Sequence, residues 1–360
     1  MTNQADDTRQ DPEPAGKTSS RKRDHVELCV REDVAFRAKT TGLEQFELEH
    51  NALPELDLED VSTSVSFLGK ECSMPLIVGS MTGGYAEAER INRELGEVCE
   101  TLRIPMGVGS QRQTLASAEY VESFRAARRA GPTIPLFGNL GAAEIARSVD
   151  VDAVRRLAEM VGADAFAIHL NPLQELMQPE GTPRFRGVLR GIESLARSLE
   201  IPLIAKEVGA GLSARSVARL LDAGVRIIDV AGAGGTSWAG VELLRRSDAA
   251  AESTFWDWGI PTAEAIAEAR PLCENANAVL IASGGITSPR EIAVAIALGA
   301  HTTAAARPLL KTLLEEGQQA LHAMLAQWGR QLRGMMFLTG SATIPELRSA
   351  PLRPLGRART

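Results

Sequence analysis

The chain has 360 residues, of which 44% are hydrophobic and 24% charged, a composition typical of a packed globular protein with one large α/β domain or two ordinary ones. Its 39 basic and 46 acidic side chains give a formal net charge of −7, which excludes recruitment of nucleic acid or anionic membrane by a global positive field. Any anionic ligand must therefore meet a local cluster of positive charge.

Two further classes are disfavoured by the pattern of residues. The four cysteines form no CxxC pair, so we expect four reduced thiols and a cytoplasmic protein, not a disulfide framework or a cysteine metal site. No uncharged apolar run is long enough to cross a bilayer, and the first twenty residues lack the apolar core of a secretory signal. We expect no membrane partner.

The N-terminal part of the chain divides into two. Residues 1–18 are polar and aperiodic, and we predict a disordered tail. Residues 19–74 are mixed, and within them Asn51–Ser66 alternates like a strand. This second segment is expected to flank and cap the mouth of the domain that follows.

From residue 75 to about 345, short apolar runs alternate with amphipathic stretches whose apolar residues recur every three to four positions. Near-continuous apolar strands between helices indicate a parallel sheet buried on both faces. The eight runs are Pro75–Met81, Pro105–Ser110, Pro135–Gly141, Ala165–Asn171, Pro202–Gly209, Ile227–Gly235, Ala278–Gly285 and His301–Pro308. Residues 346–360 are read as a C-terminal tail.

Eight such units predict a (β/α)₈ barrel, whose usual size is about 250 residues. A doubly wound open sheet is the alternative. Special residues follow every strand, as expected where a barrel builds its site at the C-terminal ends of all its strands, whereas an open sheet concentrates them at one switch point.

Several of these strand ends point to an anionic ligand. The glycines of ASGGI (282–286) and the start of AAARP (304–308) follow the last two strands, where such barrels commonly bind phosphate through backbone N–H groups. Lys206 ends an otherwise apolar strand, so it either meets an anion or has a shifted pKa, and a Schiff-base role is the rival interpretation. Ser80, Thr82, Ser110, Arg112 and Asn139 would surround the same rim.

Two other stretches are dense in polar groups. RKRDH (21–25) is the densest positive cluster of an acidic chain, and it is either a solvated surface run or an anion clamp over the mouth. HLNPLQELMQPEGTPRF (169–185) sets an imidazole, amides and a carboxylate on a loop too long for a simple strand-to-helix turn.

Together these motifs resemble the type 2 isopentenyl-diphosphate delta-isomerases, FMN-dependent enzymes on a (β/α)₈ barrel. The resemblance runs from about Arg21 to the C-terminal region and is most specific in HLNPLQE followed by QPEG. The matching stretches are RKRDH, MTGG (81–84), GSQR (109–112), HLNPLQE (169–175), QPEG (178–181), KEVGAG (206–211), GAGGTSWAGVE (232–242) and SGGI (283–286). The chain departs from the pattern at Thr287, where arginine is common, and at Ala304, where glycine is common.

The resemblance implies the placement of the cofactor. FMN phosphate would be held after the seventh and eighth strands, and Lys206 would stabilise the anionic reduced ring. NADPH would serve only to keep the flavin reduced. The implied FMN-binding residues are Ser80, Met81, Thr82, Ser110, Asn139, Lys206, Thr236, Gly284, Gly285, Ala306 and Arg307.

The resemblance also implies the substrate site and the reaction, the isomerisation of isopentenyl diphosphate to dimethylallyl diphosphate. Reduced FMN would act as the acid–base group, Glu175 would bind Mg²⁺ on the diphosphate, and Gln174, His169 and Lys206 would be the catalytic side chains. A homo-oligomer, a tetramer or an octamer, is implied as well. The implied substrate-binding residues are Arg21, Lys22, Ser110, Gln111, Arg112, His169, Asn171 and Gln174.

Two other functions are compatible with such a barrel. An FMN-dependent oxidoreductase of the hydroxy-acid oxidase type would need a His-Gly-Gly-Arg stretch on the late strands, and the sequence has none. A catalytically silent barrel that binds a phosphorylated ligand is the other, and protein purified without a yellow flavin spectrum would favour it.

Overall fold

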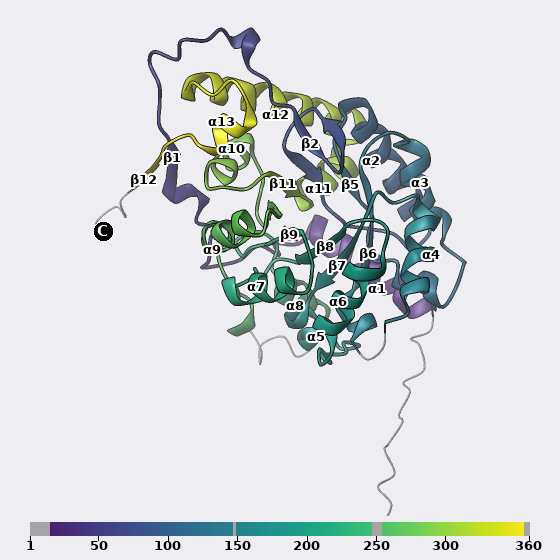
Figure 1. The fold of residues 1–360 in the computed structure, drawn as a ribbon. Coiled ribbons are helices and arrows are strands. Elements are labelled where there is room, and N and C mark those ends of the chain that lie inside the picture. The colour runs from purple at the N-terminus through teal and green to yellow at the C-terminus, as the bar shows by residue number, and fades with distance from the viewer. Residues whose placement is uncertain (1–14, 147–148, 247–253, 356–360) are drawn as a thin grey trace, which may run out of the picture.

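The protein is a closed barrel of eight parallel strands, seen in the computed structural model, which describes residues 15–146, 149–246 and 254–355 (Figure 1). Each predicted apolar run contains one barrel strand, so the predicted (β/α)₈ barrel is confirmed. The strands are β4 (Leu76–Val78), β5 (Met106–Gly107), β6 (Leu136–Gly141), β7 (Ala165–Leu170), β8 (Leu203–Glu207), β9 (Ile227–Asp229), β10 (Val279–Ser283) and β11 (Thr302–Ala305).

The strands pair in chain order, and β11 closes the barrel by pairing with β4, with Thr303 opposite Leu76. Helices follow the strands and pack around the barrel. They are α2 (Ala88–Leu102), α3 (Glu122–Ala130), α4 (Val151–Val161), α5 (Pro172–Met177), α6 (Val188–Ser198), α7 (Ala214–Asp222), α8 (Trp238–Arg245), α9 (Thr262–Asn275), α10 (Pro289–Ala297), α11 (Arg307–Glu316), α12 (Gln318–Thr339) and α13 (Ile344–Arg348).

Alternate strand residues build two hydrophobic layers. One set packs outward against the helices in a large core that includes Leu76, Val78 and Ile168. The other set fills the inside of the barrel, where Ile77 and Phe137 meet their counterparts from the other strands. Strands buried on both faces explain why the sequence runs are almost continuously apolar.

The N-terminal segment closes both ends of the barrel. Helix α1 (Ala15–Arg31) lies at the C-terminal ends of the strands, where His25 and Cys29 line a cavity. The hairpin of β2 (Val65–Phe67) and β3 (Lys70–Cys72) covers the opposite end. In Figure 1 the hairpin is in front of the barrel and the purple α1 behind it.

Several predicted boundaries differ from the structure. Helix α1 begins at Ala15, inside the segment predicted as a disordered tail, whose residues 1–14 lie outside the described residues. The predicted strand over Asn51–Ser66 is wrong, since only Val65 and Ser66 of it lie in a strand, β2. The C-terminal tail is structured as far as Pro354, because β12 (Leu352–Pro354) pairs antiparallel with β1 (Phe46–Leu48).

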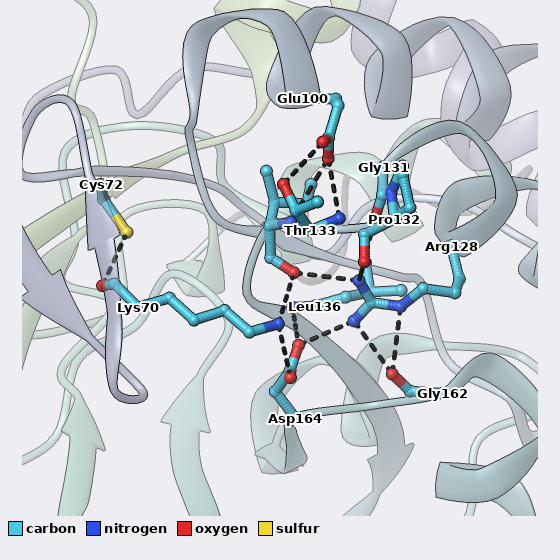
Figure 2. Close-up of polar contacts among 11 residues, drawn as sticks. Lys70, Cys72, Glu100, Arg128, Gly131, Pro132, Thr133, Leu136, Gly162 and Asp164 are labelled. Atoms are coloured by element: carbon cyan, nitrogen blue, oxygen red, sulfur yellow. Dashed lines mark hydrogen bonds and ion pairs between the residues drawn. The ribbon is translucent and has the colours of Figure 1, made fainter.

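A polar network joins the hairpin to the barrel at the end remote from the cavity (Figure 2). The carboxylate of Asp164 accepts from Lys70 Nζ at 2.7 Å, from Arg128 Nη2 at 2.7 Å and from the backbone N–H of Leu136 at 2.8 Å. Burial raises the pKa of Asp164, but these three donors outweigh burial and hold that pKa below its ordinary value. Asp164 therefore connects the hairpin, α3 and β6 through one charge.

Two expectations about the whole chain can be compared with the structure. The four cysteines are buried and free, which confirms the prediction of unpaired thiols. Within the three described ranges, no helix combines the length and the apolar character that a bilayer span requires.

Candidate active site

A cavity of about 680 Å³ opens at the C-terminal ends of the barrel strands, within the size range of cofactor pockets. Loops after β4, β8, β9, β10 and β11 line it, and α1 forms one wall through His25, Val26 and Cys29. Eight of the predicted flavin-binding residues line this cavity: Ser80, Met81, Lys206, Thr236, Gly284, Gly285, Ala306 and Arg307.

Lys206 lies beside a buried carboxylate that the sequence reading missed. It pairs in register with Asp229 across β8 and β9, and its Nζ donates to the carbonyl of Glu207 at 2.7 Å. Asp229 Oδ1 accepts from Ser283 Oγ at 2.6 Å and from the N–H of Ala231 at 3.2 Å. Burial raises the pKa of Asp229, and Lys206 opposes that rise. The signal available in the sequence is an aspartate inside the apolar run IIDVA.

The loop after Lys206 is fixed by its own carboxylate. Glu207 is 4% exposed, and its Oε2 accepts from four successive backbone N–H groups, those of residues 208–211. Burial raises the pKa of Glu207, and these N–H groups oppose that rise. The KEVGAG stretch therefore forms a rigid edge of the cavity.

The opposite end of the cavity has the features of a phosphate site. Gly284 and Gly285 have φ values of 99° and 77°, a region that favours glycine. A Cβ at Gly284 would lie 2.0 Å from the carbonyl oxygen of Gly232, so close backbone packing also requires glycine here. Helix α11 begins at Arg307, with Ala306 as its N-cap residue, and presents its free N–H groups to the same space.

The Arg307 side chain points elsewhere than the sequence suggested. Its Nε donates to the carbonyl of Cys29 at 2.8 Å and its Nη2 to the carbonyl of Glu32 at 2.8 Å. These two bonds direct the guanidinium to the end of α1. At the other departure from the family pattern, Thr287 Oγ1 donates to Glu291 at 2.9 Å, beside the N-terminus of α10.

Three predicted cofactor ligands lie outside the lining of this cavity. The carbonyl of Thr82 accepts from Asn92 and from the N–H of Gly109, and the carbonyl of Ser110 accepts from Lys22. Asn139 is buried, and its Nδ2 donates to the carbonyl of Val108 at 3.3 Å. They lie on the side of the barrel mouth that carries the polar HLNPLQE stretch.

His169 connects the cavity with that side. Its Nδ1 lies 2.8 Å from Asn139 Oδ1, and because Asn139 uses its amide nitrogen on Val108, the histidine Nδ1 carries the hydrogen. Desolvation lowers the pKa of His169 to about 3, and the charges of Lys206 and Lys22 add to this. The free ring is therefore neutral, with Nε2 as an acceptor, until an anion binds nearby.

Three cations crowd together beside His169. Lys22 Nζ donates to the carbonyl of Ser110 at 2.7 Å. Burial lowers the pKa of Lys22 to about 7, and Arg21 and Arg112 lower it further. Arg112 Nε lies 2.8 Å from Glu144 Oε1, a carboxylate whose pKa is raised by burial. Crowded positive charge of this kind is what a polyanion would relieve.

Gln111 does not join this cluster. It is fully buried, its Nε2 donates to the carbonyl of Leu157 at 2.8 Å, and its Oε1 accepts from the N–H of Asn139 at 3.0 Å. Its amide is thus unavailable to a diphosphate in this arrangement, and its contacts position Asn139. We therefore remove Gln111 from the predicted substrate ligands.

The HLNPLQE stretch forms the end of β7 and the short helix α5, and its side chains are bonded in series. Asn171 Nδ2 donates to Gln174 Oε1 and to Glu175 Oε1, both at 3.1 Å. Glu175 Oε2 accepts from the N–H of Thr182 at 2.7 Å, which explains the need for the QPEGT loop. Within the described ranges, no group of three or more His, Cys, Asp and Glu side chains could hold a metal ion.

The series continues to three residues to which the sequence assigned no role: Glu242, His25 and Arg245. Gln174 Nε2 donates to Glu242 Oε1 at 3.2 Å, and His25 Nε2 lies 2.9 Å from the same oxygen. Arg245 Nη1 lies 2.6 Å from Glu242 Oε2. Glu242 is 0% exposed, and this burial raises its pKa. His25 and Arg245 outweigh the effect of burial, so the pKa of Glu242 lies below its ordinary value. The signals were the ends of the RKRDH and GAGGTSWAGVE motifs.

Solved structures with a similar fold include mandelate oxidases. One, a mutant enzyme with (S)-mandelic acid, has a TM-score of 0.66, is 19% identical and covers 94% of this chain and 97% of its own. Another, with (S)-2-phenylpropionate, has a TM-score of 0.65 at 18% identity and covers 94% and 98%. At these identities the likeness shows the fold alone.

Sequence relatives are more informative. The chain matches the FMN-dependent dehydrogenase family over residues 15–134 and 150–354. It is 46% identical to an isopentenyl-diphosphate delta-isomerase of Chlorobium phaeovibrioides, covering 94% of this chain and 98% of the relative. The enzyme of that name from a Nostoc species is 42% identical, with 93% and 95% covered. The chain therefore belongs to the isopentenyl-diphosphate delta-isomerases, an FMN-dependent group within the FMN-dependent dehydrogenase family.

Proposed function

We propose that the protein converts isopentenyl diphosphate to dimethylallyl diphosphate in isoprenoid biosynthesis, with FMN in the cavity and the diphosphate at the cation cluster of Arg21, Lys22 and Arg112. The observation that carries this proposal is the position of His169. It lies opposite Lys206 across β7 and β8, and its Nδ1 is bonded to Asn139, which is paired with the loop on which Lys22 is held. A single small ligand can therefore contact the cofactor and the cations together.

The residues present fit FMN. Ser80 Oγ lines the cavity, is buried and has no hydrogen-bond partner within the described residues, so a polar ligand atom would satisfy it. Lys206 supplies a cation for the ring, and the N-terminus of α11 with Gly285 supplies N–H groups for the phosphate. When bound and reduced, FMN supplies a proton donor and an electron-rich ring, and NADPH maintains the reduced state.

Glu175 would hold one Mg²⁺ ion beside the diphosphate. Glu175 is 8% exposed and is oriented by Asn171 and by the N–H of Thr182. A hard cation prefers oxygen ligands and keeps several waters, so one carboxylate and the diphosphate oxygens form a suitable set. Burial raises the pKa of neighbouring Glu144, Arg112 opposes that rise, and the charge of Glu175 adds to it.

Gln174 is the proposed polar group at the alkene end of the substrate. Its amide is oriented at both ends, because Oε1 accepts from Asn171 and Nε2 donates to Glu242. The isomerisation adds a proton to the terminal alkene carbon and removes one from the allylic carbon, which requires fixed polar groups around the developing positive charge. When the diphosphate binds, its negative charge would favour protonated His169, whose Nε2–H would then donate to it beside the cations of the cluster.

The test is the stoichiometry of the reduced enzyme. Protein loaded with FMN and reduced once without oxygen should convert many equivalents of isopentenyl diphosphate without further consumption of reductant. In D₂O, deuterium should enter the methyl group formed from the terminal alkene carbon.

An oxidoreductase would instead consume one redox equivalent per turnover. One-to-one consumption of NADPH with product, or an inert reduced enzyme, would refute the isomerase proposal. Repeated turnover with oxidised flavin alone would refute the role given to the reduced form. Purified protein that binds no flavin would favour the silent phosphate-binding barrel.

A further inference from the structure

Arg307 belongs to two parts of the site at once. Its backbone starts α11 at the phosphate end of the cavity, while its side chain reaches across to the end of α1. The two segments are separated by more than 270 residues in the chain, since Arg307 and Cys29 are 278 positions apart. One residue thus joins the proposed phosphate site to the N-terminal helix.

Helix α1 carries groups for both the cavity and the cation cluster. Lys22, His25 and Cys29 follow a spacing of three and four residues, which places them on one face of a helix. Lys22 reaches the carbonyl of Ser110, His25 reaches Glu242, and Cys29 lines the cavity. The position of this single helix therefore determines where the side chains of Lys22 and His25 lie.

The C-terminal end of α1 needs partners from outside the helix. The last four carbonyl groups of a helix have no intrahelical donor, and the carbonyl of Cys29 is one of them, because α1 ends at Arg31. Arg307 donates to this carbonyl and to that of Glu32 just beyond the helix. It also brings a positive charge to the negative end of the helix dipole. Cys29 is 9% exposed, so water is a poor substitute there.

We propose that Arg307 is a positioning residue, not a ligand of the flavin phosphate through its side chain. It fixes the end of α1 and thereby the placement of Lys22 and His25. This inference rests on the proposed flavin and diphosphate sites.

The experiment compares Arg307→Ala, Arg307→Lys and the matched control Arg333→Ala. Arg333 also donates to a distant backbone carbonyl, that of Glu59, but on α12. For each protein, the affinities of the apo form for FMN and for riboflavin are measured by flavin fluorescence. Hydrogen exchange of residues 19–32 is measured by mass spectrometry in the FMN-loaded form, and kcat and KM for isopentenyl diphosphate follow.

Arg307→Ala should speed exchange in α1 about tenfold or more, as expected for loss of charge-assisted bonds at a helix end. It should raise KM more than it lowers kcat, and it should leave the ratio of FMN to riboflavin affinity within about twofold of wild type. Arg307→Lys, which keeps a cationic donor, should recover part of the protection, and Arg333→Ala should not change exchange in α1.

A phosphate ligand would behave in the opposite way. If Arg307→Ala reduces the preference for FMN over riboflavin tenfold or more, or leaves exchange in α1 unchanged, the positioning role is refuted. If Arg307→Ala does not fold, the same two measurements on Arg307→Gln, which removes the charge but keeps a polar side chain, decide. An inactive wild-type enzyme would refute the proposed function but not the exchange result, so the two failures are distinguishable.

Discussion

Replacing Glu242 by Gln tests whether the series of hydrogen bonds behind the substrate is needed for turnover. One oxygen of the glutamate accepts from Gln174 and lies 2.9 Å from His25 Nε2, and the other accepts from Arg245. A glutamine keeps the shape but has one acceptor and one donor. Its oxygen should turn to the permanently charged Arg245, which leaves its NH₂ group facing Gln174 and His25.

The consequence passes along the series. Gln174 would have to flip to offer its oxygen to residue 242, and its NH₂ group would then face that of Asn171, which now donates to it. Loss of one hydrogen bond to a charged group costs about 1.5–3 kcal/mol. Since 1.4 kcal/mol corresponds to a factor of ten, kcat/KM should fall by about 10- to 140-fold.

The assay follows dimethylallyl diphosphate formation by anaerobic, reduced enzyme, with flavin affinity measured in parallel. Flavin affinity should remain close to wild type, because Glu242 is not part of the cavity lining. Glu180→Gln is the matched control, since Glu180 also pairs with Arg245, at 3.2 Å, but is more exposed. A Glu242→Gln enzyme within twofold of wild type, or one that loses flavin and activity together, would refute this reasoning.

Three other perturbations follow from the structure. Glu175→Gln should abolish the Mg²⁺-dependent increase in turnover while flavin affinity is retained, and a titration with MgCl₂ that still gives full activity would remove Glu175 from the metal site. Burial lowers the pKa of Lys22 to about 7, so the free enzyme loses this cation as pH rises through that value. The kcat/KM of the wild-type enzyme should therefore fall above pH 7. The pH profile of Lys22→Arg should lack this fall. Asp164→Asn should lower the free energy of unfolding at pH 7 by about 1–3 kcal/mol through loss of charged bonds from Lys70 and Arg128. The pKa of Asp164 is depressed in the folded state, so the stability that Asp164 contributes is complete above the ordinary carboxyl pKa and is lost as pH falls through the folded-state pKa. The urea unfolding curves of wild type and Asp164→Asn should therefore converge in acid. Equal stability of the two proteins at pH 7 would contradict this role of Asp164.

The barrel was predictable because its signals are local. Each strand appears in the sequence as an apolar run, since both faces are buried, and each run ends in residues that reach the mouth. Pairing between distant segments has no such signal. Strand β12 was read as a tail because its partner β1 lies about 300 residues earlier, with Leu352 opposite Leu48.

Side-chain direction explains where the site in the structure differs from the site predicted from the sequence. The family resemblance places Gln111 and Arg307 at the mouth of the barrel, and both do lie there. The sequence does not show that one amide turns to the backbone of Leu157 and that one guanidinium turns to Cys29. Glu242 and His25 were overlooked for the converse reason, since their roles arise only when α1 and α8 meet.

The order of the lining residues along the chain also affects biogenesis. The cavity draws on residues from His25 to Lys311, and the barrel closes only when β11 pairs with β4. A nascent chain therefore has no complete flavin pocket until residue 311 has left the ribosome. During synthesis β4 exposes an unpaired edge, so a growing chain depends on protection from aggregation over more than 220 residues, and flavin can enter only after that stretch has been translated.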